Sequence, residues 1–172
     1  MNEKFEQFTI ICKALNEQGI TPLLMGSVGL EVLTERSWQA RDLDIHVPGD
    51  ARGWDVPAEK SIDEWSEIMK RMEGLGYRLV DLHEHQFLKD GEEVEFGIID
   101  TLPAFAGIPI EQLKLQERAG VCFYLPTAEQ YLRIYEASSK DSYRSNKNNN
   151  KDQEKIMYLL ELQQNNPGNL SF

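Results

Sequence analysis

The chain has 172 residues, 41% hydrophobic and 27% charged, which suits one globular domain or a domain with a small appendage. Its formal net charge of -11 disfavours nucleic acids and anionic membrane surfaces as partners. No apolar run is long enough to span a membrane, and Cys12 and Cys122 lack the spacing of a zinc site or a disulfide framework. These bounds predict a cytoplasmic protein.

The first third of the chain predicts a helix, a strand and a second helix in close succession. Apolar residues recur at helical spacing through residues 3–18, and Gly19 follows as a helix stop. The apolar run at 21–25 predicts a short buried strand. Gly26 and Ser27 then form a turn into a short packed helix. This order places a glycine-serine turn at the N-terminal end of a helix.

Residues 42–47, DLDIHV, alternate polar side chains with apolar ones. This pattern predicts a strand whose apolar side chains pack on one face, while Asp42, Asp44 and His46 share the other. Taken alone, such an acidic pair is more typical of an exposed edge than of a metal site, and a lone histidine there is more often structural than catalytic. The glycine-serine turn upstream lies at a compatible spacing, so together the two features favour a metal site over an exposed edge.

The middle of the chain predicts a helix followed by three strands. SIDE, at residues 61–64, is a capping-box pattern and predicts the start of a helix. Strand-like segments follow at 77–82 and 85–89. The dipeptide of Asp90 and Gly91 is a strong signal for a hairpin turn into a third strand.

That third strand, residues 92–99, adds further carboxylates. Its apolar side chains share one face, whereas Glu93 and Glu95 share the opposite face. Taken alone, Glu95 is as consistent with a solvent-facing strand residue as with a functional carboxylate. A neighbouring strand could nevertheless bring it close to Asp42 and Asp44.

The C-terminal third changes character. Residues 103–120 predict a loop or half-helix, and residues 121–125 predict a strand. Thr127 and Gln130 have the spacing of residues that cap a helix, so a further helix is expected to begin there.

The end of the chain is polar. Residues 141–150 predict a low-complexity link, residues 151–163 a final helix, and the segment from Asn165 onward a frayed tail. We therefore expect a core at residues 1–125 and a C-terminal helical extension, residues 126–172, packed on it.

The chemistry of these residues suits a nucleotide and a divalent cation. Parallel carboxylates such as Asp42 and Asp44 repel each other, and they persist as ions only with a cation between them. Oxygen ligands suit Mg²⁺ or Mn²⁺, and Mg²⁺ usually completes its shell with water and substrate phosphates. Gly26 and Ser27, at the start of a helix, suit phosphate binding. Glu95 could share the metal or accept a proton from an attacking hydroxyl.

Two arginines lie between the turn and the acidic strand. The side chains of Arg36 and Arg41 could bind triphosphate oxygens, because guanidinium pairs well with phosphate. Balancing the neighbouring acidic residues is the alternative role, and it is favoured for one or both of them.

A glycine-serine turn that opens a short helix, a D-x-D strand and a carboxylate on a later strand resemble the nucleotidyltransferase superfamily related to DNA polymerase beta. Residues 10–100 are most similar to its small bacterial branch, which contains lincosamide and aminoglycoside nucleotidyltransferases. The resemblance implies a polymerase-beta-like α+β fold, with a mixed sheet flanked by helices and a C-terminal helical part.

The resemblance also implies an activity and a site. Asp42, Asp44 and Glu95 would hold divalent ions, and Ser27 would touch the terminal phosphates. The reaction would move a nucleoside monophosphate from a nucleoside triphosphate to a hydroxyl of an unidentified small molecule or protein. Glu95 stands where the superfamily usually has Asp, and Glu93 on the same face is the alternative third carboxylate.

Two other functions fit the same residues. One is a catalytically inactive protein that keeps the fold and binds nucleotide or metal, because the longer Glu95 side chain shifts its carboxylate. The other is a toxin-like transferase that modifies tRNA or a protein, with tRNA disfavoured by the acidic net charge. A growth defect on expression that Asp44→Ala abolishes would identify the toxin-like transferase.

Overall fold

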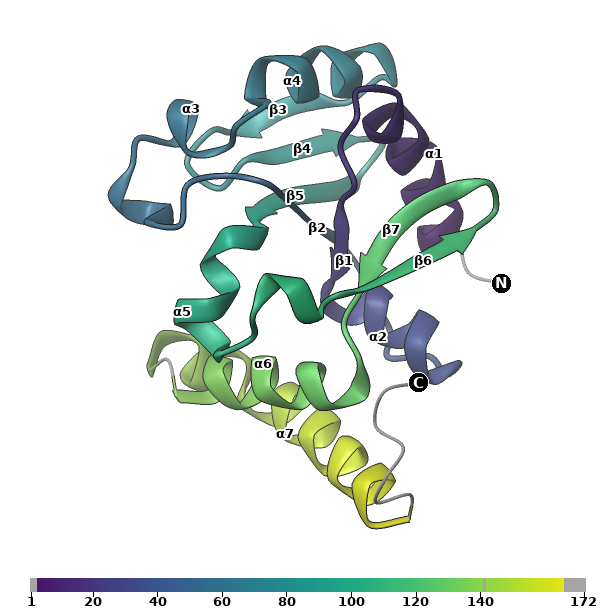
Figure 1. Cartoon of the computed structure of the whole chain (residues 1–172), viewed down its shortest axis with the longest axis vertical. Coiled ribbons are helices and arrows are strands. Elements are labelled where there is room, and N and C mark those ends of the chain that lie inside the picture. The colour runs from purple at the N-terminus through teal and green to yellow at the C-terminus, as the bar shows by residue number, and fades with distance from the viewer. Residues whose placement is uncertain (1–2, 141, 166–172) are drawn as a thin grey trace. The chain divides into compact units, whose positions relative to one another are not determined.

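The computed structural model describes residues 3–140 and 142–165 of the chain (Figure 1). Tertiary contacts divide the chain into two compact units. The sheet unit comprises Met1–Thr101 and Lys114–Leu125, and the helical unit comprises Leu102–Leu113 and Pro126–Phe172. The domain boundary expected after residue 125 stays a prediction. Among the described residues, no helix combines the length and the apolar character needed to cross a membrane.

The sheet unit is built on a mixed sheet, with strands in the order β3-β4-β5-β2-β1-β7-β6 (Figure 1). The strands are β1 (Leu23–Met25), β2 (Leu43–Val47), β3 (Arg78–Asp81), β4 (Gln86–Lys89), β5 (Glu92–Ile98), β6 (Lys114–Arg118) and β7 (Val121–Leu125). β2 runs antiparallel to β1 and parallel to β5, and β1 runs parallel to β7. A mixed sheet with flanking helices confirms the predicted α+β class.

One face of the sheet shares a buried apolar core with helices of the same unit. The helices in this core are α1 (Glu3–Glu17), α2 (Gly26–Thr34) and α4 (Trp65–Gly74). Ile45 on β2 and Phe96 on β5 belong to the core. Since successive strand residues point to opposite faces, Asp44 and Glu95 lie on the other face of the sheet.

α1 also packs against β7, which is the last strand of the sheet unit in sequence. Phe8 on α1 packs edge-on against Phe123 of β7, with the ring centroids 5.1 Å apart. The side-chain amide of Asn16 donates to the Cys122 carbonyl (3.0 Å), and its oxygen accepts from the Cys122 backbone N–H (2.9 Å). β7 is therefore bound to α1 as well as to β1.

The structure confirms most predicted elements of this unit. α1 corresponds to the helix predicted at 3–18, and β1 to the strand predicted at 21–25. β4 and β5 form the predicted hairpin, in which Asp90 and Gly91 have φ angles of 50° and 80°. Positive φ at both central residues is typical of the tight turns that match the twist of a hairpin.

The predicted start of the next helix, at residues 61–64, is wrong. Ser61 instead ends the short helix α3 (Ala58–Ser61), and α4 begins at Trp65. The Ser61 hydroxyl donates to the Ala58 carbonyl at 3.2 Å. Because this hydroxyl bonds backward into α3, it does not cap α4.

The segment predicted as a loop or half-helix at 103–120 contains more structure than expected. It holds α5 (Leu102–Ala106), the 3-10 helix η3 (Ile110–Gln112) and β6. β6 is an edge strand with mostly exposed side chains, so its sequence lacks the alternation that marks a half-buried strand. The chain turns into β7 at Ala119 and Gly120, whose φ angles are 52° and 77°.

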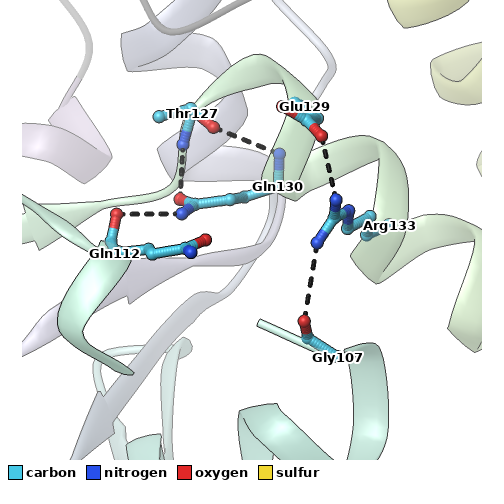
Figure 2. Close-up of polar contacts among 6 residues, drawn as sticks. All are labelled: Gly107, Gln112, Thr127, Glu129, Gln130 and Arg133. Atoms are coloured by element: carbon cyan, nitrogen blue, oxygen red, sulfur yellow. Dashed lines mark hydrogen bonds and ion pairs between the residues drawn. The ribbon is translucent and has the colours of Figure 1, made fainter. Parts of the chain in front are cut away.

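In the helical unit, α6 (Ala128–Lys140) begins with the predicted cap. The backbone N–H of Thr127 donates to Oε1 of Gln130 (2.9 Å), and the backbone N–H of Gln130 donates to Oγ1 of Thr127 (3.2 Å) (Figure 2). The Gln130 side-chain amide also donates to the Gln112 carbonyl at 3.0 Å. The start of α6 is thereby tied to η3.

The last helix, α7 (Ser142–Asn165), packs against α6 and corrects a prediction. Residues 142–150 belong to this helix, whereas the sequence predicted a link there. Ile156 and Leu159 are buried on its later turns. Because helix formation is cooperative, packing of these turns supports the polar turns before them. The predicted tail beyond residue 165 lies outside the described part of the chain.

Candidate active site

Asp44 and Glu95 are direct neighbours on two central strands of the sheet. The register pairs Asp44 on β2 with Glu95 on β5, and the same row continues to Met25 on β1 and to Gln86 on β4. Paired residues on adjacent strands point to the same face, so the two carboxylates lie side by side. Local alternation places each acid on this face, and the parallel pairing of β2 with β5 brings them together.

Gly26 brings the start of α2 against Asp44. It is the first residue of α2, and its φ of +65° is a left-handed conformation that glycine adopts without strain. A β-carbon at this position would lie 3.1 Å from the Asp44 β-carbon and 3.5 Å from Asp44 Oδ2. The N-terminal end of α2, with its positive dipole, therefore lies beside the carboxylates.

Replacing Gly26 with alanine is expected to lower the free energy of unfolding by about 2 kcal/mol, because alanine is strained at positive φ and would press on Asp44. Urea unfolding measures the loss. Gly19→Ala is the matched control, since Gly19 has a φ of +77° but no group of the described residues lies within 4 Å of the place that its β-carbon would take. Equal losses in the two variants would contradict a role for the contact with Asp44.

Glu95 carries the most perturbed carboxyl group of the site. Burial, the charge of Asp44, a hydrogen bond and the charge from Glu84, and the charge of Asp42 together raise the pKa of Glu95 from 4.5 to about 8. Each of these causes disfavours the carboxylate form. Without a cation, the Glu95 carboxyl therefore holds its proton to a higher pH than an ordinary glutamate does.

Glu84 is a member of this cluster that the sequence reasoning missed. It lies in the turn between β3 and β4, outside any strand, and its side chain hydrogen-bonds with Glu95. A signal was present in the hairpin register. The turn at Asp90 and Gly91 sets a register that pairs Gln86 with Glu95. Glu84, two positions before Gln86, is therefore expected near the Glu95 carboxyl group.

The register bears on the choice between the two acids of β5. Glu95 pairs with Asp44, whereas Glu93 pairs with Leu88 on β4. Asp42 lies just before β2 and is exposed, and its charge contributes to the raised pKa of Glu95. The register therefore makes Glu95, and not Glu93, the direct neighbour of Asp44 on β5.

The remaining predicted residues lie at the start of α2 and after its end. Ser27 is the second residue of α2 and is half-buried. Arg36 and Arg41 are exposed in the segment between α2 and β2. The guanidinium group of Arg36 lies over the Trp38 ring, 4.0 Å from its centroid. This contact is a cation–π interaction and gives Arg36 a structural partner.

The donor set of the site suits a hard divalent cation. In the part of the chain that the structure describes, no group of three or more His, Cys, Asp or Glu side chains is arranged to hold a metal ion by itself. Mg²⁺, however, commonly takes one or two carboxylates and completes its shell with water and phosphates. Asp44 and Glu95 are adjacent, they repel each other, and the Asp44 side chain is 38% exposed. This pair fits such an ion.

Comparison with known proteins identifies the fold. No protein-family profile matches the sequence. The chain is 36% identical over 162 residues to the uncharacterized protein YnaI of Bacillus subtilis (strain 168), covering 94% of this chain and 98% of that protein. Its fold is similar to the solution structure of the antibiotic-resistance factor ANT(2'')-Ia, with a TM-score of 0.52 and 14% identity over 88% of this chain and 86% of that one. The similarity confirms the predicted nucleotidyltransferase fold.

Proposed function

Because the chain belongs to the same family as YnaI of Bacillus subtilis and has a nucleotidyltransferase fold, we propose that it is a metal-dependent nucleotidyltransferase. It would move a nucleoside monophosphate from a nucleoside triphosphate to a hydroxyl of a small molecule or protein. One observation carries the proposal: Asp44 and Glu95 lie opposite each other, with the glycine that opens α2 packed on Asp44. The small bacterial branch with lincosamide and aminoglycoside nucleotidyltransferases remains its proposed place in the superfamily.

The triphosphate would bind at the start of α2. Gly26 and Ser27 begin this helix, and a helix N-terminus favours negatively charged groups. Glycine at this position also lets a phosphate approach the backbone closely. Arg36 and Arg41, on the exposed segment after α2, are the proposed partners for the outer phosphate oxygens.

Asp42, Asp44 and Glu95 are the proposed ligands of Mg²⁺ or Mn²⁺. When bound, the cation would neutralise charge on the triphosphate and on the acceptor oxygen. Glu95 has a second role in the proposal: with a cation bound, which favours its ionised form, the carboxylate beside Asp44 would accept the acceptor's hydroxyl proton. Asp44 lies on β2, which pairs with both β1 and β5, and it would fix the position of the cation relative to Glu95.

Calorimetric titration with non-hydrolysable ATP and GTP analogues, with and without Mg²⁺, tests the binding half of the proposal. Wild type is expected to bind one of them only with Mg²⁺, and the Asp42→Ala/Asp44→Ala variant is expected to lose this binding. Glu93→Gln is the control, because Glu93 shares the face of β5 but pairs with Leu88. Failure of wild type to bind either analogue would contradict the proposal.

A catalytically inactive protein that binds nucleotide is the second candidate. The glutamate at position 95, where the superfamily pattern has aspartate, favours it, because an added methylene displaces the carboxylate. Pyrophosphate release from ATP or GTP, measured against a panel of hydroxyl-bearing small molecules and proteins, separates the candidates. Binding with no release from any acceptor would favour the inactive protein.

A further inference from the structure

His46 follows Asp44 on the same face of β2. Its Nε2 lies 3.3 Å from Asp44 Oδ1, and only 17% of the His46 side chain is exposed. We propose that His46 is a positioning residue that fixes the Asp44 carboxylate through the polar contact between its Nε2 and Oδ1. The contact itself is independent of the enzymatic activity, whereas its value for metal binding rests on the proposed function.

Gly97 leaves room for the imidazole ring of His46. The register of β2 and β5 pairs His46 with Gly97. A β-carbon at position 97 would lie 2.5 Å from Nε2, 2.7 Å from Cδ2 and 2.8 Å from Cε1 of His46. These distances are too short for real atoms, so the ring occupies the space that a side chain on β5 would need. The absence of a side chain at Gly97 therefore permits the position from which His46 reaches Asp44.

Asp44 is thereby confined from two directions. His46 lies next to Oδ1, and the backbone of Gly26 lies on the side of Oδ2. Glu95 stands opposite on β5, and its ionised form would repel the Asp44 carboxylate. The contact with His46 Nε2 limits rotation of the Asp44 carboxylate. A ligand carboxylate with a fixed orientation binds a cation with less loss of side-chain freedom.

The ring needs only one of its nitrogens for this role. Nδ1 of His46 is buried and has no hydrogen-bond partner among the described residues. The proposed contact needs a proton on Nε2 only. Of the amide side chains, glutamine can place an N–H near the position of Nε2, whereas leucine offers similar bulk with no donor.

A double-mutant cycle in the metal-free protein tests the contact directly. Urea midpoints would be measured for wild type, His46→Leu, Asp44→Ala and the double variant. We expect His46→Leu to lower the midpoint in wild type, to lower it much less in the Asp44→Ala background, and His46→Gln to restore most of the loss. Equal shifts by His46→Leu in the two backgrounds would overturn the proposal.

Titration with Mn²⁺ tests the consequence for the site. His46→Leu is expected to bind Mn²⁺ about tenfold more weakly than wild type, with His46→Gln close to wild type. Gly97→Ala should weaken binding similarly and add little to His46→Leu. Wild-type affinity in His46→Leu would overturn the positioning role. Coupling in the urea cycle without Mn²⁺ binding by wild type would instead support the contact and contradict the proposed function.

Discussion

Replacing Glu95 with glutamine is expected to lower the rate of nucleotide transfer by about 10²- to 10⁴-fold, the usual contribution of a positioned proton acceptor. Glutamine keeps the size of the side chain but neither accepts the hydroxyl proton nor carries the charge that a cation requires. The measurement is kcat for pyrophosphate release with an acceptor found by the panel described above. Mg²⁺-dependent nucleotide binding should fall less than kcat, because Asp42 and Asp44 remain.

The matched control for this variant is Glu93→Gln. Glu93 lies on the same face of β5, one pleat away, and pairs with Leu88 and not with Asp44. We expect a much smaller loss of rate than in Glu95→Gln, because Glu93 lies two residues along β5 from the partner of Asp44. A large loss in Glu93→Gln with an unchanged rate in Glu95→Gln would reverse the assignment of the third carboxylate.

The metal-free protein is expected to lose stability as the pH rises from about 5 to about 8, a range set by the pKa of Glu95. That pKa is raised from 4.5 to about 8 in the folded chain. Between these values the unfolded chain has released the proton while the folded chain still holds it. Raising the pH therefore favours unfolding, and the contribution of Glu95 to the free energy of unfolding falls by up to a few kcal/mol.

Urea unfolding in the presence of EDTA, at several pH values across this range, measures the effect. Groups remote from the site change the stability of wild type and Glu95→Gln alike, so the difference between the two proteins reports Glu95 together with the acids coupled to it, Asp44, Glu84 and Asp42. We expect wild type to lose stability relative to Glu95→Gln as the pH rises. Parallel pH profiles would contradict the raised pKa of Glu95.

The carboxylate pair could be predicted because strand alternation is a local property. The pattern of residues 42–47 fixes the face of Asp44, and the pattern of 92–99 fixes the face of Glu95. Local alternation does not show which strands lie side by side. The pairing of β2 with β5 joins segments about fifty positions apart in the chain, and the sequence supplied it through a resemblance and not through a pattern.

The misses have more than one physical cause, and not all of them are tertiary contacts. Glu84 lies in a turn, where no periodicity marks the direction of a side chain. Ser61 has a helix-capping pattern, yet its hydroxyl bonds to Ala58. β6 has too few buried residues to show alternation. The polar residues 142–150 form a helix whose later turns pack against α6.

The position of β1 between β2 and β7 has a consequence for synthesis on the ribosome. β2 follows β1 closely, so the pair that holds Met25 against Asp44 can form early. β7 is completed only at Leu125, and until then the apolar face of α1 lacks the cover that Phe123 provides. Such delayed, long-range pairing slows folding and leaves apolar surface open to aggregation. A nascent chain that ends before Phe123 therefore exposes apolar surface of α1 that the complete sheet unit covers.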